Sequence, residues 1–175
     1  VKIPVFASLN CVTDSWWTSY AKQLAATGAD GLEINLSRLP RNLTETSEEA
    51  ETRLVRIIEK VTSEVAIPVA AKIGPYFTTL PRLAVRLKKA GASALVLFNR
   101  FYQLDIDPEK MKLSPGYQFS SAAEMYTSLR WISILSGQVE CDLSASTGVH
   151  DGKAAIKQLL RSEERRVGKE CRSRW

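Results

Sequence analysis

The feature that most constrains the fold is a regular alternation of short apolar segments with longer amphipathic ones. In the longest amphipathic segment, residues 47–63, Leu54, Ile57, Ile58 and Val61 recur every three or four residues, as on one face of a helix. The short segments predict strands at 5–9, 32–36, 69–73, 95–98 and 141–145. The longer ones predict helices at 14–27, 47–63, 80–90, 122–135 and 151–160. This alternation predicts an α/β fold of about five βα units.

Both an open doubly wound sheet and a closed barrel satisfy this alternation, and internal repeats favour the barrel. Residues 1–9 (VKIPVFASL) align with residues 65–73 (VAIPVAAKI), and residues 28–32 (GADGL) resemble residues 91–95 (GASAL). A repeated helix–Gly-Ala–strand unit is typical of a (β/α)8 barrel. Since five units cannot close eight strands, we expect a partial TIM barrel that lacks about three units.

The last fifteen residues, 161–175 (RSEERRVGKECRSRW), resemble a common sequencing adapter translated in one reading frame. We therefore expect two parts: residues 1–160, a fragment of one barrel domain, and residues 161–175, a non-native tail outside the fold. The tail contributes +3 of the formal net charge of +5, so the remaining +2 gives little reason to expect a nucleic-acid partner.

Neither a charged-then-apolar leader nor an apolar run of membrane-spanning length stands in the sequence, which predicts a cytoplasmic protein without a membrane partner. Outside the tail the cysteines are Cys11 and Cys141, and neither belongs to a CxxC motif. They indicate no disulfide framework.

Polar residues stand where the expected strands end. They are Ser8 and Asn10, Glu33 and Asn35, Lys72, Asn99, and Ser146–Thr147–Gly148. In barrel enzymes these ends converge on one mouth, where catalytic groups lie. The set is rich in hydrogen-bond donors and predicts no metal site. The position of Asn10 after a strand is typical of a turn residue. The position of His150, one residue before an expected helix, is typical of a capping or solvated residue. Lys72 lies within an apolar run and needs an anionic partner or must lose its proton, which favours a functional role.

One stretch, residues 100–121, is too long for a simple connection between a strand and a helix. It contains Asp105, Asp107, Pro108, Pro115 and Gly116. Either a lid or binding loop, or a surface excursion, would account for it.

Several segments together resemble the dihydroorotate dehydrogenase family, in its dihydroorotate dehydrogenase-like branch, over residues 1–160. They are residues 3–10 (IPVFASLN), 28–35 (GADGLEIN), 67–75 (IPVAAKIGP), 95–107 (LVLFNRFYQLDID) and 142–150 (DLSASTGVH). The resemblance implies the middle part of an FMN-dependent oxidoreductase that converts dihydroorotate to orotate in pyrimidine biosynthesis. It also implies a small-molecule substrate and allows a homodimer of the full-length protein.

The resemblance implies site residues by position. Ser8, Asn35 and Lys72 would contact the flavin, with the lysine charge near N1 and O2, where reduction places negative charge. Asn35 and Asn99 would bind the substrate. Ser120, with Ser121, would belong to a loop returning over the cofactor, and Thr147 and Gly148 to a phosphate-binding turn before a helix, with Thr147 in place of a family glycine.

The loop after Asn35 departs from the family pattern. Arg38 occupies the position of the catalytic Cys or Ser base, and Pro40 that of a further substrate-binding Asn. A guanidinium cannot accept a proton, and Ser37 could replace the base only after a shift in register, so the catalytic base stays unassigned. Two alternatives therefore remain: a flavin-binding barrel without dihydroorotate dehydrogenase activity, and a Schiff-base lyase that uses Lys72.

Overall fold

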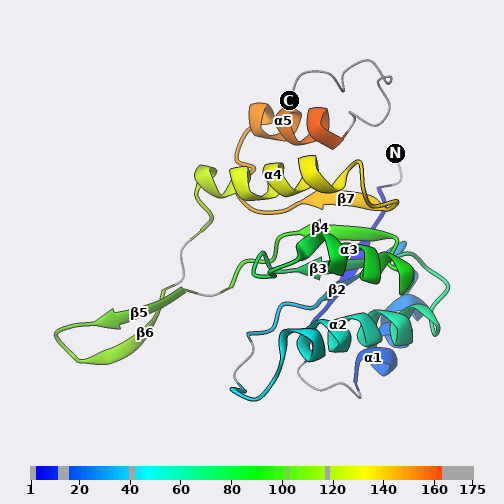
Figure 1. The fold of residues 1–175 in the computed structure, drawn as a ribbon, viewed down its shortest axis with the longest axis horizontal. Helices are drawn as coiled ribbons and strands as arrows, with labels where there is room; N and C mark the ends of the chain where they lie inside the picture. The colour runs from blue at the N-terminus through cyan, green and yellow to red at the C-terminus, as the bar shows by residue number, and fades with distance from the viewer. Residues whose placement is uncertain (1–2, 12–15, 40–41, 102, 117–118, 163–175) are drawn as a thin grey trace.

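The computed structural model describes residues 3–11, 16–39, 42–101, 103–116 and 119–162 of the 175-residue chain. They form an α/β fold around a five-stranded parallel sheet (Figure 1). The sheet strands are β1 (Phe6–Leu9), β2 (Gly31–Asn35), β3 (Val69–Ile73), β4 (Ala94–Leu97) and β7 (Asp142–Ala145). The helices are α1 (Trp17–Ala26), α2 (Ser47–Thr62), α3 (Leu80–Lys89), the short 3-10 helix η1 (Ala122–Glu124), α4 (Met125–Leu135) and α5 (Gly152–Ser162).

The strands lie in the sheet in the order in which they occur in the chain, β1-β2-β3-β4-β7. Each strand pairs in parallel with the next; Ser8 lies opposite Glu33, and Asn35 opposite Lys72. A doubly wound sheet reverses its strand order at a switch point, whereas this order runs in one direction. The arrangement is consistent with the expected partial barrel.

The helices cover one face of the sheet. On each strand, alternate residues belong to the main hydrophobic core, for example Ile34 on β2 and Ala71 on β3, and both are fully buried. The residues between them, such as Glu33, Asn35 and Lys72, therefore point to the opposite face. A sheet with helices on a single face has the layering of a barrel wall, in which that opposite face is the interior.

Helix α2 begins with a capping box. Thr46 Oγ1 accepts a hydrogen bond from the Glu49 backbone N–H (3.2 Å), and Glu49 Oε2 accepts one from the Thr46 N–H (2.8 Å). The hydrogen bonds from Thr46 hold the pKa of Glu49 below its ordinary value. The T-x-x-E pattern thus fixes the residue at which α2 starts.

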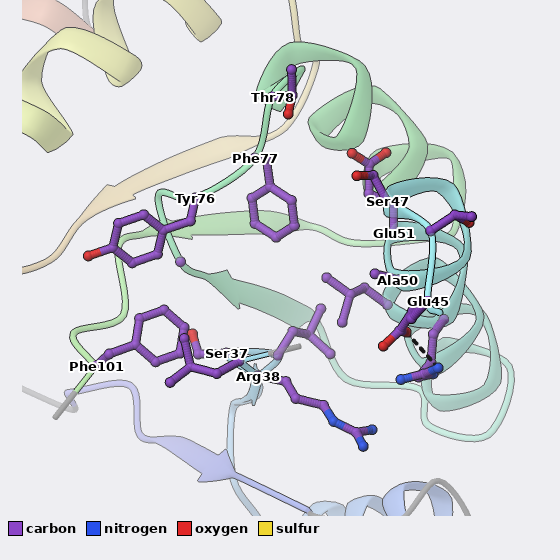
Figure 2. Close-up of a pocket in the computed structure, with 16 residues that line it drawn as sticks. Ser37, Arg38, Glu45, Ser47, Ala50, Glu51, Tyr76, Phe77, Thr78 and Phe101 are labelled. Carbon is purple, nitrogen blue, oxygen red and sulfur yellow. Dashed lines mark ion pairs between the residues drawn. The ribbon is translucent and has the colours of Figure 1, made fainter. Parts of the chain in front are cut away.

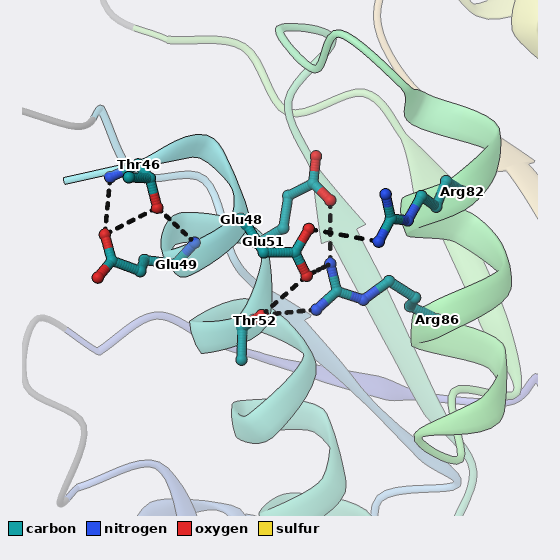
Figure 3. Close-up of polar contacts among 7 residues, drawn as sticks. All are labelled: Thr46, Glu48, Glu49, Glu51, Thr52, Arg82 and Arg86. Atoms are coloured by element: carbon teal, nitrogen blue, oxygen red, sulfur yellow. Dashed lines mark hydrogen bonds and ion pairs between the residues drawn. The ribbon is translucent and has the colours of Figure 1, made fainter.

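Polar contacts connect α2 with α3 (Figure 3). The Arg86 guanidinium lies 3.1 Å from Glu51 Oε2 and 3.2 Å from Glu48 Oε1, and it donates a hydrogen bond to Thr52 Oγ1 (2.6 Å). The Glu51 side chain is only 8% exposed. These contacts join the two helices that follow β2 and β3 in the chain.

Residues 100–121 contain an antiparallel hairpin of β5 (Gln103–Asp107) and β6 (Lys112–Gly116), which the sequence reading did not anticipate. The hairpin projects away from the end of β4 rather than folding over the sheet (Figure 1), as a surface excursion does. Leu104, Ile106 and Leu113 share one of its faces, and each is at least 60% exposed.

The ends of the helices differ slightly from the sequence prediction. Helix α1 begins at Trp17, and the predicted N-cap at Thr13 or Asp14 lies outside the described residues. Helix α5 continues to Ser162, two residues into the predicted tail. Residues 163–175 lie outside the described residues, so the tail stays a prediction. None of the described helices is both long and apolar enough to cross a membrane.

Candidate functional site

A polar cluster lies on the uncovered face of the sheet, near the carboxyl ends of the strands. Glu33 Oε1 accepts a hydrogen bond from Ser8 Oγ (2.8 Å) and one from Lys72 Nζ (3.2 Å). The Lys72 and Glu33 side chains are 21% and 19% exposed, so water only partly screens their charges. Lys72 has the anionic partner that its position requires. Glu33 was among the polar residues predicted at the strand ends, but the sequence did not predict its contacts with Ser8 and Lys72.

Asn35 lies beside this cluster, directly opposite Lys72 in the pairing of β2 with β3. Its Oδ1 accepts a hydrogen bond from the Ser37 N–H (3.2 Å), which forms an Asx turn at the start of the following loop. That contact uses an acceptor and leaves the amide NH₂ as a donor group. The structure therefore brings Ser8, Asn35 and Lys72 together.

Asn99 follows β4, and its backbone N–H donates to the Ile73 carbonyl oxygen at the end of β3 (2.8 Å). It is half-buried and stands where β4 leads into the hairpin. Because β4 lies between β3 and β7, Asn99 lies between the cluster around Lys72 and a second polar group that follows β7.

The second group contains Ser120, Gly148 and His150. Ser120 Oγ accepts a hydrogen bond from the Gly148 N–H (3.2 Å) and lies 3.0 Å from His150 Nε2. His150 is exposed, as expected, but it also contacts this serine. Asp151 caps α5 by accepting a hydrogen bond from the Ala154 N–H (2.7 Å). Two groups were predicted to bind a phosphate, the N–H of the turn and the N-terminus of α5. The first already donates to Ser120 and the second to Asp151.

Thr147 and Gly148 both have left-handed backbone conformations, with φ of 76° and 71°. A side chain on Gly148 would collide with the Met125 backbone nitrogen, so a glycine is required there. Thr147 is β-branched and adopts a conformation that glycine prefers. The prediction that Thr147 and Gly148 bind a phosphate stays a prediction.

Glu124 lies near this second group, at the end of η1. Its carboxylate accepts hydrogen bonds from the Ser121 N–H (2.9 Å) and from Arg100 Nε (3.0 Å). The Ser121 hydrogen bond, followed by Arg100 and the charge of His150, holds the pKa of Glu124 below its ordinary value. Glu124 is therefore a fixed negative charge at neutral pH.

Arg38 is exposed and lines a cavity of about 190 Å³ between the loops after β2 and β3 and the first turns of α2 (Figure 2). Ser8, Lys72 and Asn99 do not line this cavity, so it is separate from the polar cluster. Ser37 Oγ is buried beside Arg38 and has no hydrogen-bond partner among the described residues. Pro40 lies outside those residues.

The fold and this site define a class: an α/β protein whose five-stranded parallel sheet is consistent with a partial barrel. Near the carboxyl ends of its strands it presents a polar cluster that contains the ion pair between Lys72 and Glu33. Among the described residues, no three His, Cys, Asp or Glu side chains form a group that could bind a metal ion.

Comparisons with known proteins identify the fold. No family model matches the sequence, and no curated protein sequence matches it. Among solved structures, the chain is similar to the crystal structure of a DHODH from Eimeria tenella in complex with ferulenol. The TM-score is 0.55 and the sequence identity 20%, over 83% of this chain and 46% of that chain. This chain thus spans less than half the length of its structural neighbour, and what the two share is the fold.

Proposed function

We propose that the chain is part of an eight-stranded barrel that binds FMN and acts as an oxidoreductase of the dihydroorotate dehydrogenase type. The sequential strand order, the helices on one face and the similarity to a DHODH over 46% of its length support this proposal. In this proposal, about three further βα units close the barrel between the outer edges of β1 and β7.

The observation that carries the function is the position of Lys72. An ammonium group has three N–H donors, and Glu33 accepts one of them. Two remain for the ring oxygen and nitrogen atoms of a flavin lying over the uncovered face. Ser8 and Asn35 would bind the same ring. FMN, when bound, supplies an acceptor for hydride, and the fixed positive charge of Lys72 stabilises the negative charge that develops on the ring.

The phosphate end of the predicted flavin site fits less well than the ring end. An anion at the turn formed by Thr147 and Gly148 must replace Ser120 Oγ as acceptor of the Gly148 N–H, and it meets the Asp151 carboxylate at the start of α5. The proposal therefore rests on the cluster around Lys72.

The presence or absence of a catalytic base distinguishes an active dehydrogenase from a flavin-binding barrel without that activity. Arg38 cannot accept a proton, and Ser37 has no partner among the described residues that could activate it. We infer that turnover of dihydroorotate is slow. The alternative, a Schiff-base lyase, requires a lysine free to attack a carbonyl carbon, whereas Lys72 Nζ lies 3.2 Å from Glu33 Oε1 in an ion pair.

The test uses the complete reading frame that contains residues 1–160. We expect the purified protein to contain bound flavin, visible in its absorbance spectrum. Lys72→Met should weaken FMN binding about tenfold or more, the effect of losing a charge-assisted hydrogen bond. Lys88→Met, which changes an exposed lysine of α3, is the matched control and should leave FMN affinity unchanged. Equal affinities in the two variants would contradict the role of Lys72.

A further inference from the structure

The cavity between α2 and the loops after β2 and β3 has two distinct walls (Figure 2). Tyr76, Phe77 and Phe101 lie on one side, and the first turns of α2, with Glu45 and Ala50, lie on the other. The cavity is distinct from the polar cluster around Lys72, so a ligand here does not depend on the proposed flavin site.

The aromatic wall contains a pair of tilted rings. Phe101 and Tyr76 have ring centroids 5.6 Å apart, with an angle of 31° between their planes. The Phe101 ring lies over Gly74, where an added Cβ would be 2.8 Å from the nearest ring carbon. Glycine at this position therefore lets an aromatic ring approach the backbone at the end of β3.

The volume of the cavity limits the size of the ligand that it can hold. An apolar cavity of about 150 Å³ binds benzene, and this cavity has a volume of about 190 Å³. It can therefore hold a six-membered ring with one small substituent. The aromatic side chains favour a flat ring, because offset or tilted aromatic pairs are attractive.

Two buried oxygen atoms indicate which polar groups a ligand of this cavity should carry. Ser37 Oγ and Glu45 Oε1 are both buried and accept no hydrogen bond from the described residues. Glu45 Oε1 lies 2.7 Å from Arg53 Nη2, in an ion pair without hydrogen-bond geometry, and the Glu45 side chain is only 10% exposed. Burying an acceptor without a donor is unfavourable, so a ligand N–H group would satisfy Ser37 Oγ. A second N–H group could bond to Glu45 Oε1, whose charge Arg53 already balances.

Charge adds a further condition. The carboxylate of Glu45 is paired with Arg53, and that of Glu51 with Arg86. A neutral ligand leaves these pairs intact, whereas a charged one would compete with them. We propose that this cavity is a binding site for a small, neutral, planar ring that carries an amide or another N–H donor.

The experiment compares two probes of the same size, benzamide and acetophenone, on the complete 175-residue chain. Binding is measured by ¹H–¹⁵N NMR titration. We expect benzamide to shift signals from residues 36–39, 45–54 and 74–78, and to bind about three- to tenfold more tightly than acetophenone, which lacks the N–H donors. Equal binding of the two probes, or shifts elsewhere in the chain, would overturn the proposal.

Variants test the same site. Ala50→Leu fills the cavity from α2 and should abolish benzamide binding, whereas Ala26→Leu, at the exposed end of α1, should leave it unchanged. Ser37→Ala should remove most of the preference for benzamide over acetophenone. If the full preference for benzamide persists after Ser37→Ala, Ser37 Oγ is not the proposed acceptor. If a variant fails to fold, the titration of the unchanged chain still tests the proposal.

Discussion

Replacing Arg86 with methionine should destabilise the chain far more than the same change at Arg82. Methionine retains most of the aliphatic packing of an arginine stem, so the change chiefly removes the guanidinium. In the Arg86→Met variant, the Glu51 carboxylate loses the cation 3.1 Å from it. Thr52 also loses the hydrogen bond that it accepts from Arg86.

The magnitude follows from burial. Removing one partner of a buried ion pair costs about 3–5 kcal/mol. The Glu51 side chain is 8% exposed but that of Arg86 is 21% exposed. We therefore expect a cost around the lower end of this range, about 2–4 kcal/mol. For a chain of this length, that lowers the midpoint of thermal unfolding by about 4–16 °C. Among the described residues, Arg82 pairs only with Glu48, at 3.5 Å, and both side chains are more than half exposed. Its replacement should therefore cost less than about 1 kcal/mol.

Thermal unfolding followed by circular dichroism measures both variants. A double variant, Glu51→Met with Arg86→Met, should recover most of the stability, because no buried carboxylate is then left without a cation. If Arg86→Met and Arg82→Met lowered the midpoint equally, or if the double variant were less stable than Arg86→Met, the reasoning from burial would be wrong.

Three further changes test other parts of the structure. Thr147→Gly should raise the unfolding midpoint, because relief of a left-handed β-branched residue stabilises by about 1 kcal/mol; an unchanged or lower midpoint contradicts this. Glu124→Gln should destabilise at neutral pH, and the difference from the unchanged chain should shrink as pH falls below 4.5 in acid titrations of stability. The folded pKa of Glu124 lies below that ordinary value, so its contribution is present above it and is lost in acid. Gly31→Ala should destabilise because the Phe6 ring covers Gly31, and Phe6→Ala in the same chain should reduce this effect.

The regular elements were predictable because local periodicity and packing agree. Strand β3 and the start of α2 have the predicted bounds, since an apolar run and a T-x-x-E cap define them locally. The hairpin was missed because Pro108 and Pro115 made the segment resemble irregular loop. The alternation of Leu104 and Ile106 with aspartates, followed by a turn, was the signal that could have identified it.

The site was predictable to the extent that it depends on strand parity. Ser8, Asn35 and Lys72 share a face because each follows the alternation of its strand. The pairing of Lys72 with Glu33 depends on which strands are neighbours, and the contact of Ser120 with Gly148 joins segments 28 residues apart. Periodicity along a single segment contains no information on such contacts. The cavity beside Arg38 likewise arises from four separate segments, residues 36–39, 45–54 and 74–78 with Phe101.

Because the helices cover a single face of the sheet, the residues of each strand fall into two sets. One set faces the helices, and the other faces the open side. Changes at Ile34 or Ala71 act on the core that holds the helices, whereas changes at their neighbours Glu33 and Lys72 act on the open face. A lineage of such proteins could therefore alter its chemistry at exposed or half-buried positions of the open face with less effect on the core beneath the helices. In a deep mutational scan of β2 and β3, tolerance measured by protein abundance should alternate with a period of two residues.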